Sequence, residues 1–243
     1  VKKFVSGVDA KKAAAAAGVD MELLEEAAQK FGTADKVAVV FGADVTGAAA
    51  VTDITAALAN FAILSGALKG DGGGVYLVDE RPNTQGLLDA GVSPERLPGG
   101  LDYSKKADVA AQAWGCVKLP DKGRNAVQIL EGVEQGEIKF LYLAGVNPLI
   151  TYPESQRWRN ALEKLECLVV QDILESDLSN LADVVLPAAS FAEKSGTYIA
   201  CDNTAGLLQQ ALKPLGKAKT DGEILASLYR AVSGRDASAD PAE

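Results

Sequence analysis

Short apolar runs alternate along the chain with longer segments whose apolar residues recur at helical spacing. The runs at 37–42, 139–145, 168–171 and 183–186 predict strands covered on both faces, as in a parallel sheet. Two further strands are predicted at 75–80 and 197–201. Helical spacing predicts helices at 10–17, 21–32, 48–64, 125–135, 153–165, 175–182 and 221–232. This alternation predicts an α/β fold of mainly parallel sheets with helices on both faces.

The same pattern predicts two α/β subdomains. Residues 1–100 form the first, residues 101–123 form a connecting excursion of low regularity, and residues 124–234 form the second. Residues 235–243 are a polar tail for which we expect disorder. Because the chain starts at Val1 rather than at a methionine, we expect it to be a fragment of a larger subunit.

Charge and hydropathy exclude several classes of function. The 33 acidic against 24 basic residues give a net charge of −9, which argues against a surface for nucleic acid or anionic membrane. No apolar run reaches the roughly 20 residues that span a bilayer. We therefore expect a cytoplasmic protein, or one peripheral at the inner face of the membrane as part of a complex, without direct membrane insertion.

The residue types present limit the chemistry further. The chain has no histidine, which excludes histidine bases, Ser-His-Asp triads and histidine-ligated metals within it. Its three cysteines, Cys116, Cys167 and Cys201, are far apart and form no Cys-x-x-Cys pair, so no iron–sulfur or zinc signature is present. We assign no catalytic residue and no metal ligand to this chain.

Polar and turn residues follow the predicted strands where open α/β sheets bind ligands, at the carboxyl edge. Gly145-Val146-Asn147-Pro148 follows one strand and is either a ligand-binding loop or a plain turn into a helix. Asp172 follows the next strand. It would either accept two hydrogen bonds from a guanine or ribose edge or cap the following helix. Both alternatives stay open from the residues alone.

Three other motifs give weaker signals. The glycine-rich segment 70–74 lacks the lysine and hydroxyl of a phosphate loop and precedes a strand, which favours a flexible connector. Residues 41–44 occupy the place after the first strand that corresponds to the Gly145 loop. Glu193 and Lys194 would either pair with each other or hold a neighbouring loop.

Three motifs, in order along the chain, carry a resemblance to a known family. They are GALKGDGGGVYLVDERPNTQGLLDAGVSPERLPGG, FLYLAGVNP and ADVVLPAASFAEKSGTY. Their order and rough spacing resemble those of the molybdopterin oxidoreductase superfamily. The resemblance is greatest to the C-terminal region of the large (G) subunit of NADH-quinone oxidoreductase (complex I), and the formate dehydrogenase alpha subunit is a close relative.

The resemblance implies a site for a pterin guanine dinucleotide at these strand ends. The positions that match its lining are Gly145, Asn147, Asp172, Gly196 and Thr197. Catalytic family members also carry a cysteine, selenocysteine or serine metal ligand and an N-terminal iron–sulfur cysteine cluster. After Gly-Thr the family reads Asn and then Glu-Gly-Arg, whereas here the arginine that would pair with phosphate is replaced by Leu207.

These departures predict a non-catalytic, scaffold-like region of an NADH-quinone oxidoreductase large subunit, which supports electron transfer from NADH to quinone. We expect no cofactor in this chain, with molybdopterin guanine dinucleotide as the alternative, and iron–sulfur clusters elsewhere in the full subunit. The expected partners are other subunits of an electron-transfer complex. Two alternatives stay open: a fragment of a molybdenum or tungsten formate dehydrogenase-like catalytic subunit, and a nucleotide-binding module without redox chemistry.

Overall fold

The computed structural model describes residues 1, 6–46, 50–69, 72–78 and 81–238. By its internal contacts the chain divides into two compact units. Unit 1 comprises Val1–Thr84 and Ile199–Thr204, and unit 2 comprises Gln85–Tyr198 and Ala205–Glu243. Unit 1 is therefore discontinuous in sequence, whereas the two subdomains predicted above are continuous.

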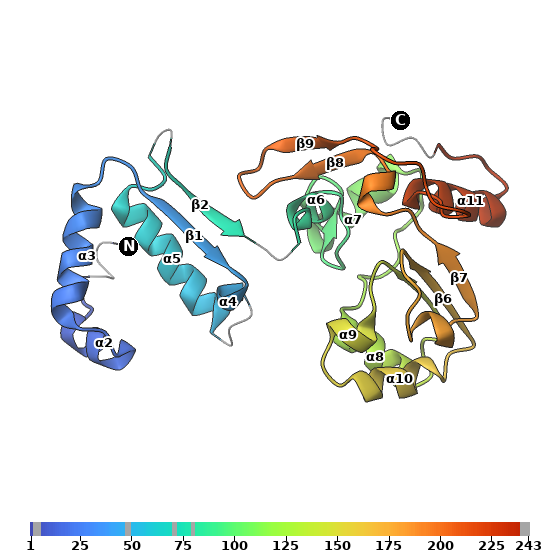
Figure 1. Ribbon diagram of the computed structural model, residues 1–243, viewed down its shortest axis with the longest axis horizontal. Helices are drawn as coiled ribbons and strands as arrows, with labels where there is room; N and C mark the ends of the chain where they lie inside the picture. Colours follow the sequence, from blue (N-terminus) through green and yellow to red (C-terminus); the bar gives the residue numbers. More distant parts are fainter. Residues whose placement is uncertain (2–5, 47–49, 70–71, 79–80, 239–243) are drawn as a thin grey trace. The chain divides into compact units, whose positions relative to one another are not determined.

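Unit 1 contains a parallel pair of strands joined by a helix (Figure 1). Its elements are α2 (Ala10–Ala17), α3 (Met21–Thr33), β1 (Ala38–Gly42), α4 (Ala43–Thr46), α5 (Val51–Ser65) and β2 (Gly74–Val78). Asp9 and Asp20 cap α2 and α3 by accepting backbone N–H hydrogen bonds, as their positions predict. The short helix α4 replaces the loop expected after β1.

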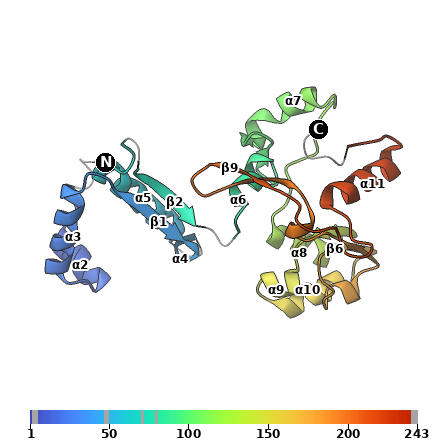
Figure 2. The ribbon, with the colours of Figure 1, turned by 45° about the horizontal axis from the view of Figure 1, so that its top comes forward.

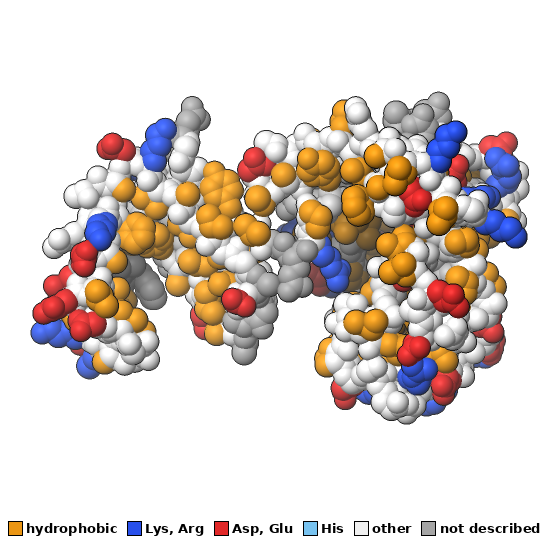
Figure 3. Space-filling view, in the orientation of Figure 1, with side chains coloured by type: hydrophobic (Ala, Val, Ile, Leu, Met, Phe, Trp, Pro, Cys, Tyr) orange, Lys and Arg blue, Asp and Glu red, His pale blue; other side chains and the backbone are white. Residues whose placement is uncertain are grey.

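One face of β1 is packed and the other is exposed, so the prediction that strand 37–42 is covered on both faces is wrong. Val39 is buried against Ala62 of α5, while Val40 and Val78, on the opposite face, are 64% and 52% exposed. Hydrophobic side chains accordingly gather over these strands in Figure 3. Residues 48–49, 70–71 and 79–80, which belong to the predicted helix 48–64, the glycine-rich segment and the predicted strand 75–80, lie outside the described residues.

The first part of unit 2 corrects the expected excursion at 101–123. After α6 (Thr84–Asp89), strands β3 (Arg96–Leu97) and β4 (Leu101–Asp102) pair antiparallel and lead into an eleven-residue helix, α7 (Tyr103–Ala113). The side chain of Asp102 caps α7 by accepting the Ser104 N–H at 2.9 Å. This helix was missed because its alanine-rich sequence has only a weakly apolar face.

The second part of unit 2 is a three-stranded parallel sheet in the order β5-β6-β7. Its elements are α8 (Ala126–Glu134), β5 (Phe140–Ala144), α9 (Pro148–Thr151), α10 (Ser155–Leu162), β6 (Cys167–Asp172), the 3₁₀ turn η1 (Ser179–Leu181) and β7 (Val184–Pro187). Helices α8, α9 and α10 lie beside β6 (Figure 2). Leu168 and Val170 of β6 pack with residues of α8, α9 and α10 in the largest core cluster. All four residues 168–171 are buried, as predicted for a strand covered on both faces. The same prediction is wrong for 139–145 and 183–186, because Phe140, Val184 and Val185 are 59%, 44% and 48% exposed.

The predicted helix at 175–182 is wrong: the structure has only η1 there. The Ser179 hydroxyl accepts the Ser176 N–H at 2.8 Å and donates to the Ser176 carbonyl at 2.7 Å. A serine that captures nearby backbone groups competes with regular helical hydrogen bonding. Leu178, fully buried in the core, fixes this compact turn beneath the sheet edge.

The chain ends with a hairpin and a helix. The elements are the 3₁₀ turn η2 (Phe191–Glu193), β8 (Gly196–Ile199), β9 (Ala205–Leu208) and α11 (Asp221–Ser233). Strand β8 is shorter than the predicted 197–201 because the chain turns at Asn203, which has a left-handed φ of 63°. Strand β9 was not predicted.

The alternation of strands and helices and the parallel sheets confirm the predicted α/β class. Within the described ranges, no helix combines the length and apolarity needed to cross a membrane. The predicted tail lies partly outside them, because residues 239–243 are not described.

Candidate functional site

The carboxyl ends of β5, β6 and β7 form the edge at which the sequence predicted a ligand. Backbone pairing places Ala144 beside Gln171, and Asp172 beside Pro187. Gly145 follows Ala144 directly, so Gly145, Asp172 and Pro187 come from three adjacent strands and share one edge. The structure thus brings together two of the five predicted lining residues, Gly145 and Asp172.

Gly145 adopts a backbone conformation that suits glycine. Its φ is 63°, in the left-handed region, and its N–H donates to the Gln171 carbonyl at 2.8 Å. Apart from its chain neighbours, no described residue comes within 4 Å of a Cβ built on Gly145, so the space beside this residue is open. A ligand could therefore approach the backbone closely here.

Asn147 serves the local turn. Its Oδ1 accepts the Leu149 N–H at 3.0 Å, which caps the four-residue helix α9, and Pro148 begins that helix. Its Nδ2 lies 3.5 Å from the Ser176 hydroxyl. The side chain thus ties the loop after β5 to the loop after β6, and this local role supports the turn interpretation of Asn147.

Asp172 caps no helix, because none follows it within reach. Its Oδ1 accepts the N–H of the next residue, Ile173, at 2.7 Å, and its backbone carbonyl accepts the Ala188 N–H at 3.0 Å. Among the described residues its Oδ2 has no hydrogen-bond partner. The half-buried carboxylate therefore keeps one oxygen available to a donor from outside the chain.

Gly196 and Thr197 lie on β8, which belongs to a two-stranded sheet, whereas Gly145 and Asp172 lie at the edge of the three-stranded sheet.

Glu193 and Lys194, which precede β8, do not pair with each other. Glu193 accepts the N–H groups of Ser190 and Leu215, and hydrogen bonding from Ser190 is the main cause that lowers the pKa of Glu193. Lys194 instead pairs with Asp221 of α11. Of the two alternatives for this motif, holding neighbouring segments is confirmed.

The aspartate of the ADVVLP motif has a structural role in this chain. The Asp183 carboxylate accepts the Leu168 N–H at 2.7 Å, and the Asp183 N–H donates to the Leu168 carbonyl at 2.9 Å. These two bonds join the start of β7 to the start of β6 and fix their register. The motif thus places Pro187 opposite Asp172 at the far end of the strands.

The hairpin formed by β8 and β9, which carries Leu207, is held together by contacts among its own residues. Asp202 accepts hydrogen bonds from the N–H and hydroxyl of Thr204, which lower the pKa of Asp202. Gly206 lies beneath the Tyr198 ring, because a Cβ built there would be only 2.3 Å from Tyr198 Cζ. Leu207 is 74% exposed, and its side chain offers no donor to a phosphate.

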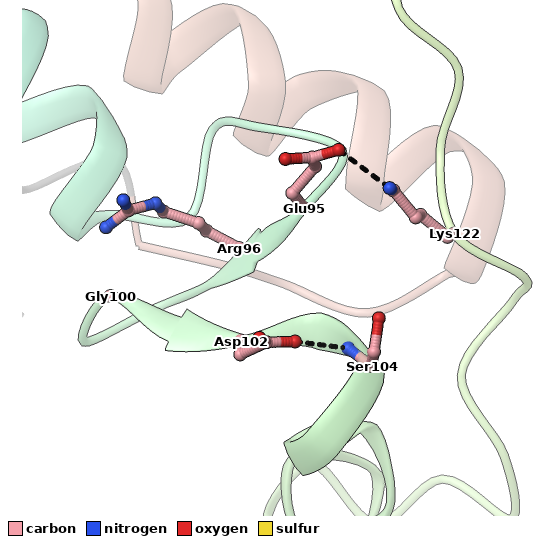
Figure 4. A pocket seen from close by; sticks show the side chains of 6 residues that line it. All are labelled: Glu95, Arg96, Gly100, Asp102, Ser104 and Lys122. Atoms are coloured by element: carbon pink, nitrogen blue, oxygen red, sulfur yellow. Dashed lines mark hydrogen bonds and ion pairs between the residues drawn. The ribbon is translucent and has the colours of Figure 1, made fainter. Parts of the chain in front are cut away.

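A polar pocket lies apart from the sheet edge, within unit 2 (Figure 4). Its volume is about 360 Å³, and it is lined by Glu95, Arg96, Gly100, Asp102, Ser104 and Lys122. Lys122 pairs with Glu95 at 2.7 Å, which lowers the pKa of Glu95, and Asp102 is used as the cap of α7. Figure 4 shows Arg96 directed away from the Glu95–Lys122 pair. Both carboxylates are thus satisfied within the chain.

An apolar cavity of about 530 Å³ adjoins the end of β7. Leu186 and Pro187 line it together with Lys217, Lys219, Ile224, Ser227 and Leu228. The sequence gave no signal that α11 would form the wall opposite Leu186 and Pro187. Over the described part of the chain, no group of three or more Cys, Asp or Glu residues is placed to hold a metal ion.

Comparison with known proteins identifies the family. Residues 6–231 match the model of the molybdopterin oxidoreductase family, and the chain belongs to that family. It is 41% identical over 239 residues to the NADPH-Fe(3+) oxidoreductase subunit alpha of Geobacter sulfurreducens, covering 98% of this chain and 28% of that protein. It thus spans less than a third of the length of this relative.

Two formate dehydrogenases are also similar. The F420-dependent formate dehydrogenase subunit alpha of Methanocaldococcus jannaschii is 34% identical, over 94% of this chain and 34% of its own length. Formate dehydrogenase H of Escherichia coli is 30% identical, over 93% of this chain and 32% of its own length. These relatives confirm the superfamily and the formate dehydrogenase relationship, but they are not large subunits of complex I. They favour a fragment of a formate dehydrogenase-like subunit over a region of an NADH-quinone oxidoreductase large subunit.

Proposed function

We propose that this chain is part of the cofactor-binding alpha subunit of a molybdenum- or tungsten-dependent oxidoreductase of the formate dehydrogenase type. In this proposal the carboxyl edge of β5-β6-β7 holds the guanine dinucleotide end of the pterin cofactor. The observation that carries it is the Asp172 carboxylate, half-buried at the end of β6, with Oδ2 unpartnered among the described residues.

The donor and acceptor types at this edge fit a guanine nucleotide. The N1–H and exocyclic amine of guanine are adjacent donors, and a carboxylate only accepts. Gly145, beside Asp172, leaves its backbone accessible to the ribose or the phosphates because, its chain neighbours aside, no described residue comes within 4 Å of a Cβ built there. When bound, the cofactor supplies the metal at which a small substrate exchanges two electrons. The residues of this chain would bind and orient its nucleotide end.

The names of the relatives support the proposal at the level of the whole subunit. Two of them are alpha subunits, which implies further subunits in their enzymes. We accordingly propose partner subunits for this protein, with the iron–sulfur clusters and the metal ligand on parts of the polypeptide outside residues 1–243.

The test is the guanine nucleotide content of the purified full-length polypeptide that carries this sequence. We expect stoichiometric pterin and guanine nucleotide together with molybdenum or tungsten. Asp172→Asn should lower the retained nucleotide on the order of tenfold, because it removes a charged hydrogen-bond acceptor. The matched control is Asp177→Asn, in the same loop, which removes a highly exposed carboxylate that lies 3.5 Å from Arg159.

A second candidate function is a cofactor-free scaffold in a complex that transfers electrons from NADH to quinone. The exposed Leu207, in place of the family arginine, favours it. Purified protein that contains neither metal nor pterin would support this scaffold and contradict the first proposal. A nucleotide-binding module without redox chemistry would retain guanine nucleotide without any metal.

A further inference from the structure

Gln171 is the buried centre of a hydrogen-bond network in unit 2 whose outer members, Lys194 and Asp221, have side chains that are 31% and 42% exposed. Its side chain is polar yet the residue is only 3% exposed. The Tyr142 hydroxyl donates to Gln171 Oε1, and Gln171 Nε2 donates to Asp221 Oδ1 at 2.6 Å. Asp221 Oδ2 accepts from the Lys194 ammonium group. The network thus joins β5, β6, the first residue of α11 and the segment before β8.

The direction of each hydrogen bond follows from the chemistry of the groups. An ionised aspartate only accepts, so the amide nitrogen of Gln171 must face Asp221 and the amide oxygen must face Tyr142. The Tyr142 hydroxyl then has to be the donor. Burial, and the nearby charge of Asp221, raise the pKa of Tyr142 and keep its hydroxyl protonated.

The backbone of Gln171 connects the network to the predicted cofactor residues. Its carbonyl accepts the Gly145 N–H, and the next residue is Asp172. At the other end, Lys194 lies two residues before Gly196. Gly145 and Asp172 are in one sheet and Gly196 and Thr197 are in another, so the network bridges the two groups of predicted lining residues.

We propose that Gln171, Asp221 and Lys194 are positioning residues that hold these two groups of lining residues in one fixed arrangement. The inference rests on the proposed function only for the identity of the ligand that the two groups of residues bind. A hydrogen-bond network centred on a buried side chain restricts its members to one geometry, and loss of the Lys194 ammonium group removes the link between Asp221 and the segment before β8. The competing explanation is that the network only docks α11 against the sheet.

The test uses residue-resolved amide hydrogen exchange on the purified full-length polypeptide, freed of cofactor. Lys194→Met removes the ammonium group but leaves the Gln171–Asp221 bond in place. We expect exchange at Gly145 and Thr197 to become faster, on the order of tenfold at each. Lys139→Met is the matched control, because Lys139 forms a similar pair with Glu166 at 2.6 Å, at the other end of the same sheet.

A second variant keeps the inference testable if the first fails to fold. Asp221→Asn retains an acceptor for Gln171 but removes the charge that holds Lys194. In the double variant that combines Lys194→Met with Asp221→Asn, the amides of Gly145 and Thr197 should exchange no faster than in either single variant. All three variants lose the same Lys194–Asp221 ion pair. Faster exchange confined to α11, with Gly145 and Thr197 unchanged, would overturn the inference in favour of simple docking.

The nucleotide content of the same preparations, measured before the cofactor is removed for the exchange experiment, distinguishes this inference from the proposed function. Wild-type protein without pterin or guanine nucleotide, but with coupled exchange at Gly145 and Thr197, would refute only the proposed function. Protein that retains the cofactor but shows no coupling would refute only the positioning network.

Discussion

Replacing Leu178 with alanine tests how the core holds the candidate site. Leu178 has no exposed surface and belongs to the cluster beneath the β6 edge, with Leu168 and Val170. It ends the loop that begins at Asp172, so it anchors that loop to the core. Leu174, in the same loop, is 71% exposed and provides the matched control.

The size of the effect follows from burial. Truncation of a fully buried leucine loses its transfer free energy and leaves a cavity, which together cost about 3 kcal/mol. With a urea dependence of about 2 kcal/mol per molar, the unfolding midpoint should fall by roughly 1.5 M. Leu174→Ala should change the free energy of unfolding by less than about 0.5 kcal/mol, because its side chain is already in water.

Tryptophan fluorescence measures this transition locally. Of the two tryptophans in the chain, Trp158 is 5% exposed and belongs to the same core cluster, while Trp114 is 54% exposed. Within residues 1–243, a Trp114→Phe background leaves Trp158 as the tryptophan that reports on this core. Equal midpoints for Leu178→Ala and Leu174→Ala would refute the claim that Leu178 anchors this loop.

Three further predictions concern residues at or near the edge. Asn147→Ala should lower the free energy of unfolding by about 1 kcal/mol in urea titrations, because the cap of α9 is lost, whereas Asn147→Asp should preserve it. Gly145→Ala should cost roughly 1–2 kcal/mol in the same assay, because alanine is strained at a φ of 63°; an equal cost for Gly145→Asn, which tolerates this region, would contradict that reason. Hydrogen bonds lower the pKa of folded Glu193, so the stability it contributes is present above its unfolded pKa and is lost as the pH falls through its folded value. Glu193→Gln should therefore flatten the acid limb of stability against pH between about pH 5 and 3, and an unchanged limb would argue against this contribution.

Features set by neighbouring residues were predictable from the sequence. Asp9, Asp20 and Thr220 directly precede the predicted helices 10–17, 21–32 and 221–232, and each accepts the backbone hydrogen bonds of a helix cap. The buried strand at 168–171 was likewise clear from its apolar run. Capping and hydrophobic patterning depend on residues a few positions apart, so the sequence displays them directly.

Features that depend on distant residues were not predictable in this way. The partner of Lys194 is Asp221, and the side chain of Gln171 reaches the same carboxylate. The predicted helix at 175–182 failed because the buried Leu178 and the Ser179 hydroxyl bonds favour a compact turn. The candidate edge could be located from strand ends, whereas the network behind it required the tertiary structure.

The discontinuity of unit 1 has a consequence for biosynthesis. The Ile199 N–H donates to Asn83 Oδ1 at 3.0 Å, which closes a loop across 116 positions of sequence. During translation this bond cannot form until Ile199 has left the ribosome, about 6–23 s after Asn83 at 5–20 residues per second. By then the three strands of the β5-β6-β7 sheet of unit 2 have been synthesised, because all of them precede Ile199. The first-made unit is therefore completed only after most of the second has been synthesised.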